Sequence, residues 1–332
     1  MSKHPYTISA TPHIRSSNSI DKTMYMVLAA LAPATVLGVV FFGLRSLVIL
    51  AVSVLSCCLL EAVYQKLVRR DITVTDGSAA VTGLLLGLVM PPGVPLWLPV
   101  VGALVAIVLV KQLFGGLGHN FINPALAGRC VLAIAYAMPM AAGFTQPFGS
   151  WLELDVVAVA TPLSSFAVDG FYPGASEFLA AFIGNVSGSI GETSAVALLV
   201  GGVFLMFMKV ISWHIPLVYV GTVFVLTFLL SGSFSISVAF YHVLTGGLII
   251  GAFFMATDYP TSPITTKGKI IFAFGCGVLT SVIRLFGGMP EGVAYSILLM
   301  NLAVPLIDRF TRPRVLGNVG WVMKIRERRS KQ

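Results

Sequence analysis

The stretch Leu113-Phe-Gly-Gly-Leu-Gly-His-Asn-Phe-Ile-Asn-Pro-Ala-Leu-Ala-Gly-Arg129 interrupts an apolar run, and a weaker copy returns as Leu285-Phe-Gly-Gly-Met-Pro-Glu-Gly-Val-Ala-Tyr295. A second matching pair lies upstream of the two copies: Gly83-Leu-Leu-Leu-Gly87 in the first half and Gly247-Leu-Ile-Ile-Gly251 in the second. Hydrophobic segments broken at corresponding positions of two halves indicate a site between repeats. The pattern predicts an all-α polytopic membrane protein with broken helices.

The amino-acid composition defines the broad class of protein. The chain has 332 residues, of which 57% are hydrophobic and 10% charged, whereas soluble domains are roughly 25% charged. A helix needs about 20 apolar residues to span a bilayer, and we expect about ten such spans. They are Met24–Gly43, Ser46–Tyr64, Ser78–Trp97, Leu98–Phe114, Pro124–Met140, Thr193–Ile211, Pro216–Leu230, Ile236–Ala256, Ile270–Phe286 and Gly292–Ile307. The first run is too long for a cleaved signal peptide.

Lysine and arginine are distributed unevenly along the chain, whose formal net charge is +8. They cluster in both terminal tails and in two short loops, whereas the 141–192 loop contains five acidic residues and no Lys or Arg. Basic loops remain in the cytoplasm. We therefore predict cytoplasmic tails at 1–23 and 309–332, a transmembrane domain at 24–308, and an extracytoplasmic 141–192 loop. Basic tails of this kind favour lipid headgroups or soluble partners over nucleic acid.

The same topology sets the orientation of the two repeats. With ten spans and a cytoplasmic N-terminus, the Gly83 run passes from the inside to the outside, and the Gly247 run passes in the opposite direction. The sequence therefore predicts two inverted repeats, an arrangement found in many transporters.

Gly115, Gly116, Asn120 and Asn123 are unusual residues for an apolar run. Glycine permits backbone conformations that break a helix, and a helix that starts at Pro124 would direct its positive dipole end toward this segment. Two interpretations remain open, a ligand site and close helix packing through small residues. Irregular backbone persists in a membrane protein only where protein, water or ligand satisfies it. We predict that 115–123 and 258–263 are non-helical and line one polar cavity.

Ionisable residues near the predicted spans are candidates for function. They are Glu61, Lys111, Arg129, Asp258, Arg284, Glu291 and Asp308. Most lie near span ends, where we expect interfacial anchors. Asp258 is the exception, because it lies in the break Ala256-Thr-Asp-Tyr-Pro-Thr-Ser-Pro263.

Other chemical motifs are absent from the sequence. Its four cysteines include no Cys-x-x-Cys, so we expect packing residues and no iron–sulfur cluster held by this chain alone. His119 and His242 have no partners at metal-ligand spacing, and we predict no metal site and no catalytic residue within this chain.

Thr161 precedes a proline in the long acidic loop. A single hydroxyl in a loop is most often a turn or capping residue, although loops of this length are commonly functional. The residues alone leave both interpretations open.

The chain resembles the D subunits of Rnf ion-translocating electron-transport complexes and, more distantly, the B subunits of Na⁺-translocating NADH:quinone reductases. The resemblance rests on Phe114–Ala125, on Ala256–Pro263, on Gly288–Asn301 and on Pro305-Leu-Ile-Asp308. It covers roughly residues 20 to 310.

The resemblance implies a covalent FMN, attached by a phosphoester to the side-chain oxygen of Thr161. Asp155 and Ala160 match the family's acceptor pattern, whereas Ala158 and Val159 replace its Ser/Thr and Gly. The resemblance also implies a second, non-covalent flavin (riboflavin) in the core, near the 115–123 break.

The implied activity is electron relay in an ion-translocating ferredoxin:NAD⁺ oxidoreductase of a bacterial or archaeal cell membrane, coupled to Na⁺ or H⁺. The implied partners are the A, B, C and E subunits and the FMN-bearing G subunit. Two alternatives remain: the corresponding quinone-reductase subunit, and a transporter or channel without redox function. Gly-x-Gly-x-x-Gly and P-loop motifs are absent, so ferredoxin and nucleotide sites are expected on other subunits.

Overall fold

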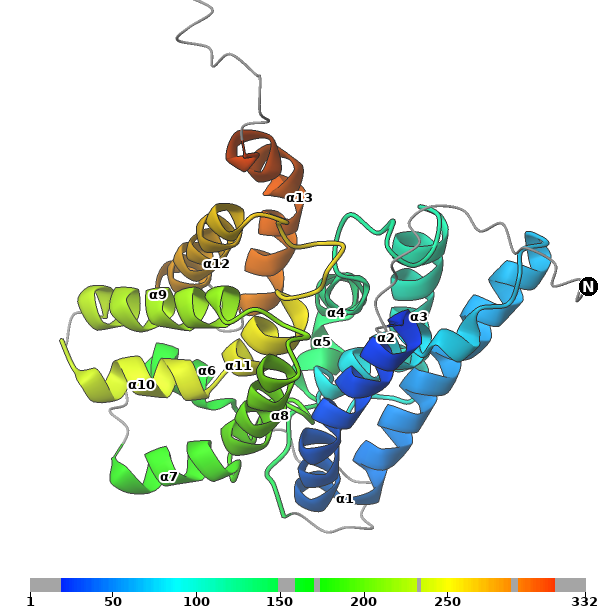
Figure 1. Ribbon diagram of the computed structural model, residues 1–332. Coiled ribbons are helices and arrows are strands. Elements are labelled where there is room, and N and C mark those ends of the chain that lie inside the picture. Colours follow the sequence, from blue (N-terminus) through cyan, green and yellow to red (C-terminus); the bar gives the residue numbers. More distant parts are fainter. Residues whose placement is uncertain (1–18, 149–158, 170–173, 232–233, 288–291, 314–332) are drawn as a thin grey trace, which may run out of the picture.

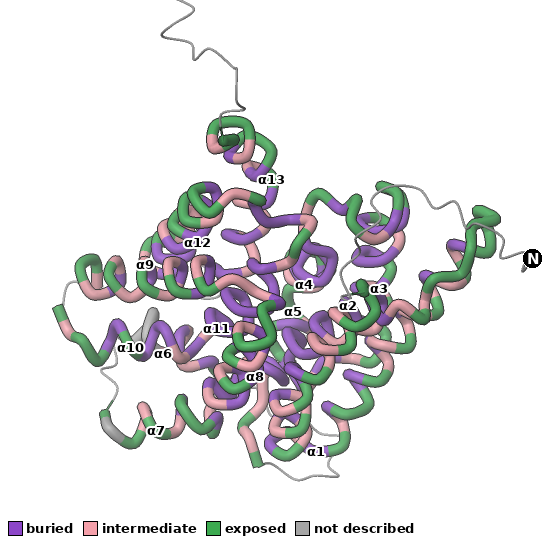
Figure 2. The backbone as a smooth tube through the Cα atoms, viewed as in Figure 1, coloured by how far each residue is buried: buried purple, intermediate pink, exposed green. Residues whose placement is uncertain are grey.

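The computed structural model describes residues 19–148, 159–169, 174–231, 234–287 and 292–313. Within these ranges every regular element is a helix, which confirms the all-α polytopic fold. α1 forms one side of the molecule, α9, α10 and α12 form the other, and α2, α4, α5 and α11 lie between them (Figure 1). Buried residues concentrate in this middle region (Figure 2).

The helices have the following bounds: α1 Ile20–Leu67, η1 Val74–Asp76, α2 Ser78–Leu88, α3 Trp97–Ala103, η2 Leu104–Gln112, α4 Pro124–Ala135, α5 Ala137–Ala141, α6 Pro162–Asp169, α7 Ala175–Ile183, α8 Ala195–Phe207, α9 His214–Leu230, α10 Ile236–Leu244, α11 Leu248–Ile250, η3 Gly251–Met255, α12 Thr266–Phe286 and α13 Val293–Thr311. η1 is a 3₁₀ helix, and η2 and η3 are π-helical.

α1 is a helical hairpin whose two arms are the first two predicted spans (Figure 1). The chain reverses at Gly43, where φ is 74° and ψ is −164°, a conformation that is strained for any residue with a Cβ. The Ser46 hydroxyl donates to the Gly43 carbonyl oxygen at 2.6 Å and so satisfies a backbone group at the turn.

Three helices in the described residues are long and apolar enough to cross a membrane: α1, α12 and α13. A fourth span is formed if α10 and the α11–η3 pair are taken together, with a bend of 64° between them. The other predicted spans correspond to apolar helices of 10–17 residues: Ser78–Leu88, Trp97–Gln112, Pro124–Ala135, Ala195–Phe207 and His214–Leu230.

Several predicted boundaries were wrong, and prolines account for two of them. The Ser78–Trp97 span ends at Leu88, because Pro91 and Pro92 cannot continue the helix. The Pro124–Met140 span is interrupted at Tyr136, because Pro139 has no N–H to donate to the carbonyl four residues earlier.

Other helix ends also differ from the predicted ones. The Thr193–Ile211 span covers only Ala195–Phe207, with Ser194 as its N-cap. α1 begins at Ile20 and α13 continues to Thr311, so ordered helix extends into both predicted tails. The 141–192 loop contains α6 and α7.

The two Gly-rich pieces of the predicted repeats run antiparallel through the centre. α2 begins at Ser78, which contacts Lys111, and its C-cap Val89 lines the same cavity as Thr161. The α11–η3 pair begins after Gly247, which lines the cavity of Thr161, and leads to Asp258, which lines the same cavity as Lys111. This opposite direction agrees with inverted repeats. At Gly83 the absence of a side chain permits close packing, since a Cβ there would lie 2.7 Å from the Cα of Val54.

Candidate functional site

Two cavities lie at opposite ends of the antiparallel pair. The larger, which we call the Lys111 cavity, has a volume of about 890 Å³. The smaller, the Thr161 cavity, has a volume of about 450 Å³. Both volumes fall in the range of about 300–1,000 Å³ that is typical of ligand sites.

The first wall of the Lys111 cavity is the break between η2 and α4. Gly115, Gly116 and Gly118 have φ values of 124°, 98° and 85°, which only glycine adopts without strain. Helix resumes where the Asn123 side chain caps α4 by accepting from the Leu126 N–H at 3.2 Å. The non-helical 115–123 segment is therefore confirmed.

The second wall is the non-helical segment between η3 and α12. Asp258 accepts a hydrogen bond from the Thr261 hydroxyl at 3.2 Å, and the polar side chain of Asn120 also favours its charged form. Burial raises the pKa of Asp258 to about 6, against the opposing effects of these two side chains and of the Lys111 charge. The prediction that both breaks line one cavity is confirmed.

Two asparagines connect the breaks to each other. Asn123 donates its side-chain amide to the Met255 carbonyl at 3.3 Å. Asn301 of α13 accepts from the Asn123 N–H at 3.1 Å and donates to the Thr261 carbonyl at 3.1 Å, with its amide oriented to satisfy both. Sequence reasoning did not select Asn301, although it ends one of the motifs that carry the resemblance, because its role depends on contacts between distant segments.

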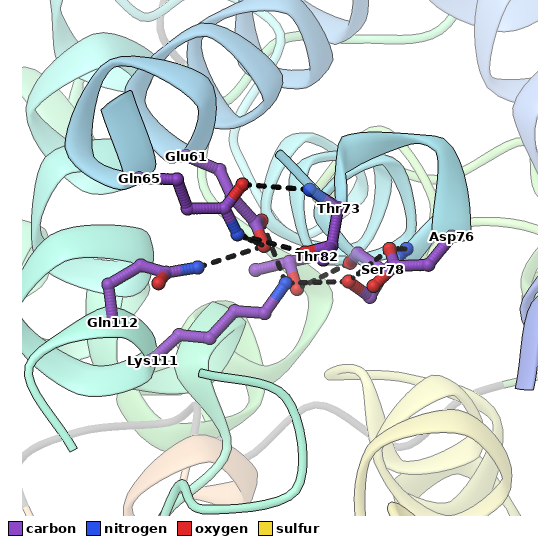
Figure 3. A network of polar contacts seen from close by, with 8 residues as sticks. All are labelled: Glu61, Gln65, Thr73, Asp76, Ser78, Thr82, Lys111 and Gln112. Carbon is purple, nitrogen blue, oxygen red and sulfur yellow. Dashed lines mark hydrogen bonds and ion pairs between the residues drawn. The ribbon is translucent and has the colours of Figure 1, made fainter. Parts of the chain in front are cut away.

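A buried ion pair lies at the wall of the Lys111 cavity (Figure 3). Lys111 Nζ lies 2.8 Å from Glu61 Oε2 and donates to Ser78 Oγ at 2.7 Å. Gln112 donates to the other oxygen of Glu61 at 2.9 Å. Gln65 donates to that same oxygen at 3.4 Å and to Thr73 Oγ1 at 2.9 Å.

The ion pair shows that the expectation of interfacial anchors was wrong for Glu61 and Lys111. Glu61 and Lys111 are 1% and 2% exposed, and Arg129 and Arg284 are also buried. A buried charge is tolerated when a partner neutralises it and hydrogen bonds satisfy the rest. Arg284 meets this need by donating to the Thr245 and Gly246 carbonyls at 3.2 and 2.8 Å, which the bend between α10 and α11 leaves free of helical bonds.

Thr161 lies at the wall of the other cavity and is 9% exposed. Its hydroxyl oxygen accepts from the Ser164 N–H at 3.4 Å, so Thr161 caps the start of α6, and its O–H donates to the Ser164 hydroxyl at 3.1 Å. The preceding carbonyl, that of Ala160, accepts from the Ser187 hydroxyl at 2.6 Å. The capping interpretation is thus correct, and the capping threonine is also one of the residues that line a cavity.

The predicted cofactor residues divide between the two cavities. Gly115, Gly116, Asn120, Asn123 and Asp258 line the Lys111 cavity, whereas Ala160 and Thr161 line the other. Further residues of the Thr161 cavity include Arg129, Cys130, Glu192, Gly247 and Tyr295. Asp155 and Glu291 lie outside the described residues. Asp308 lies in neither cavity lining, and it accepts from the Ile264 N–H at 3.2 Å.

These features define a multi-pass α-helical membrane protein with one ligand-sized cavity at each end of a central antiparallel pair. The chain belongs to the NQR2, RnfD, RnfE family, whose sequence model matches residues 7–317.

Curated relatives are similar over nearly the whole chain. The D subunit of a Na⁺-translocating ferredoxin:NAD⁺ oxidoreductase complex from Acetobacterium woodii is 46% identical, covering 94% of this chain and 95% of the relative. The D subunit of a proton-translocating ferredoxin:NAD⁺ oxidoreductase complex from Clostridium ljungdahlii is 43% identical, covering 95% and 97%. The D subunit of an ion-translocating oxidoreductase complex from Halorhodospira halophila is 37% identical, covering 93% and 94%.

Proposed function

We propose that this chain is the membrane electron-transfer subunit of an ion-translocating ferredoxin:NAD⁺ oxidoreductase. In this proposal FMN is esterified to Thr161, and a second, non-covalent flavin binds in the Lys111 cavity. The observation that carries the proposal is the position of Thr161, which lines a cavity of about 450 Å³. The names of the relatives support the overall reaction.

The residues around Thr161 fit a flavin phosphoester. The linking group keeps one negative charge, and the start of α6 directs a backbone N–H at the Thr161 oxygen, as helix N-termini do at anion sites. Arg129 lines the same cavity and supplies a cation, and Glu192 supplies a carboxylate. Bound flavin would supply the electron-accepting chemistry, while the chain supplies position and electrostatics.

The Lys111 cavity fits the second flavin by its volume and by a mainly apolar lining that includes several polar groups. The side-chain amides of Asn120 and Asn123 and the Asp258 carboxyl offer hydrogen-bond donors and acceptors on two walls, and the surrounding apolar side chains suit a ring system. Riboflavin has no phosphate, which agrees with a cavity in which Lys111 is already paired with Glu61.

The membrane orientation is part of the proposal. The absence of Lys and Arg from 141–192 supports an outer position for the Thr161 cavity and an inner position for the Lys111 cavity and both termini. Single cysteines at positions 165 and 330 of a cysteine-free chain would test it in intact cells. An impermeant thiol reagent should label position 165 and not position 330, and the reverse pattern would refute the orientation.

The partners proposed are the remaining members of such a complex, namely the A, B, C and E subunits and the FMN-bearing G subunit. The names of the relatives imply a multi-subunit assembly. Ferredoxin and NAD⁺ would bind to those partners. The coupling ion is Na⁺ or H⁺, since relatives of similar identity are named for each.

Peptide mass spectrometry tests the proposal directly. The peptide that contains Thr161 should carry the mass of one FMN phosphoester, and the purified protein should be fluorescent on a denaturing gel. An unmodified peptide from colourless protein would favour a transporter or channel without redox function. Copurification with a quinone-reducing complex would favour the quinone-reductase subunit.

A further inference from the structure

The buried ion pair at the Lys111 cavity has an asymmetric arrangement. Lys111 lines the cavity, whereas Glu61 does not. The Glu61 carboxylate is instead covered by the side-chain amides of Gln65 and Gln112 and by the Lys111 ammonium. The positive member of the pair is therefore nearer to the cavity than the negative member.

Most of the other charged residues of this cavity lie closer to solvent than Lys111. Asp21, Arg69, Arg70 and Asp71 are exposed and Asp76 is partly exposed, whereas Lys111 is 2% exposed. Charges in water-exposed positions are screened, but a buried charge acts through a medium of lower dielectric constant. Lys111 thus contributes a less-screened positive field to the cavity, and this field already reaches Asp258.

Glu61 limits the strength of that field. The carboxylate oxygen of Glu61 lies 2.8 Å from Lys111 Nζ. The pair therefore acts on the cavity mainly as a dipole whose positive end faces the cavity. The hydrogen bond from Lys111 to Ser78, which in turn donates to Asp76 at 2.6 Å, holds the ammonium in place.

We infer that Lys111 and Glu61 together set the redox potential of the flavin in the Lys111 cavity. This inference rests on the proposed function, which places the second flavin there. Reduction takes up two electrons, which arrive from the reduced FMN on Thr161, and one proton from solvent. The product carries one negative charge on its ring, so the inward-facing positive end of the pair stabilises the reduced form over the neutral oxidised form.

The test is a potentiometric titration of the purified complex, with each flavin followed separately. Acid extraction releases only the non-covalent flavin and so identifies it, while the FMN on Thr161 is an internal reference. Lys111→Met should weaken reduction of the extractable flavin about tenfold, which for a two-electron couple lowers its potential by about 30 mV. Glu61→Gln, which keeps the shape of the side chain and removes the negative charge, should shift the potential in the opposite direction.

A purely structural role for the pair predicts no such reversal of sign. The inference would be overturned if the potential of the extractable flavin shifted in the same direction in both variants. It would also be overturned if both variants retained the flavin and its potential did not change. If either single variant fails to fold, Lys111→Met combined with Glu61→Gln leaves a neutral network and should have a lower potential than the wild type. An unchanged potential in the double variant would also overturn it. Absence of extractable flavin from the wild type would instead refute the proposed second flavin.

Discussion

The two cavities are built in different ways. At the Thr161 cavity, a four-residue segment from Thr161 to Ser164 forms its own cap at the start of α6. At the Lys111 cavity, the ion pair joins residues that are 50 positions apart in the sequence and holds them with amides and hydroxyls from other segments. A local motif specifies the cap at Thr161, although distant segments line the rest of that cavity, and packing of distant helices specifies the ion pair. Substitutions should therefore act locally at one cavity and cooperatively at the other.

The largest expected effect is the loss of covalent flavin in Thr161→Ala. Removing the oxygen proposed to form the ester should abolish gel fluorescence, while membrane insertion and the extractable flavin of the other cavity remain. Thr161→Ser keeps a hydroxyl and should retain part of the fluorescence. Ser164→Ala is the matched control, because it removes a neighbouring hydroxyl and leaves the Thr161 oxygen. Full fluorescence in Thr161→Ala would refute the assignment.

The next largest effect is expected at the ion pair. Lys111→Met alone leaves Glu61 as a buried, unpaired carboxylate, and breaking such a pair costs about 3–5 kcal/mol. The combination with Glu61→Gln removes both charges and should recover much of this loss. Thermal unfolding in detergent, measured as a double-mutant cycle, would detect the coupling. Additive effects of the two substitutions would mean that the pair does not act as a unit.

A smaller effect is expected from Gly247→Ala at the bend between α10 and α11. Gly247 has φ 69°, and a Cβ there would lie 2.5 Å from Glu192 Oε1, at the wall of the Thr161 cavity. The strain should destabilise the protein by about 1–3 kcal/mol. Gly221→Ala on α9 is the control, since no atom lies within 4 Å of its added Cβ, and it should be neutral or slightly stabilising. Equal thermal stability of the two variants would contradict this account of the bend.

The smallest effect concerns pH. Burial raises the pKa of Asp258 from 3.8 to about 6, so the folded state favours the protonated acid more than the unfolded chain does. This contribution to stability is fully present below about pH 4 and is lost as the pH rises through about 6. Asp258→Asn cannot ionise. Its melting temperature relative to the wild type should therefore be higher at pH 7.5 than at pH 4.5. A melting-temperature difference between variant and wild type that does not depend on pH would show that the pKa of Asp258 is not raised.

Features carried by local sequence could be predicted well. The apolar runs and the glycine and asparagine breaks each depend on a few neighbouring residues, because proline and glycine act within one helical turn. The cap at Thr161 is equally local, but the sequence left it as one of two open interpretations. The helix ends were less predictable. The stop at Leu88 and the interruption at Tyr136 follow from nearby prolines, yet the hydropathy pattern continues through them.

The sequence by itself determined that this is a polytopic helical membrane protein with two broken, repeated segments, since apolar length and glycine placement are local properties of the chain. Only the tertiary structure decided where the charges lie. Glu61 and Lys111 both resemble interfacial anchors in the sequence, but the packing of η2 against α1 brings them to 2.8 Å. Burial then makes the pairing important, because a buried charge without a compensating partner is costly.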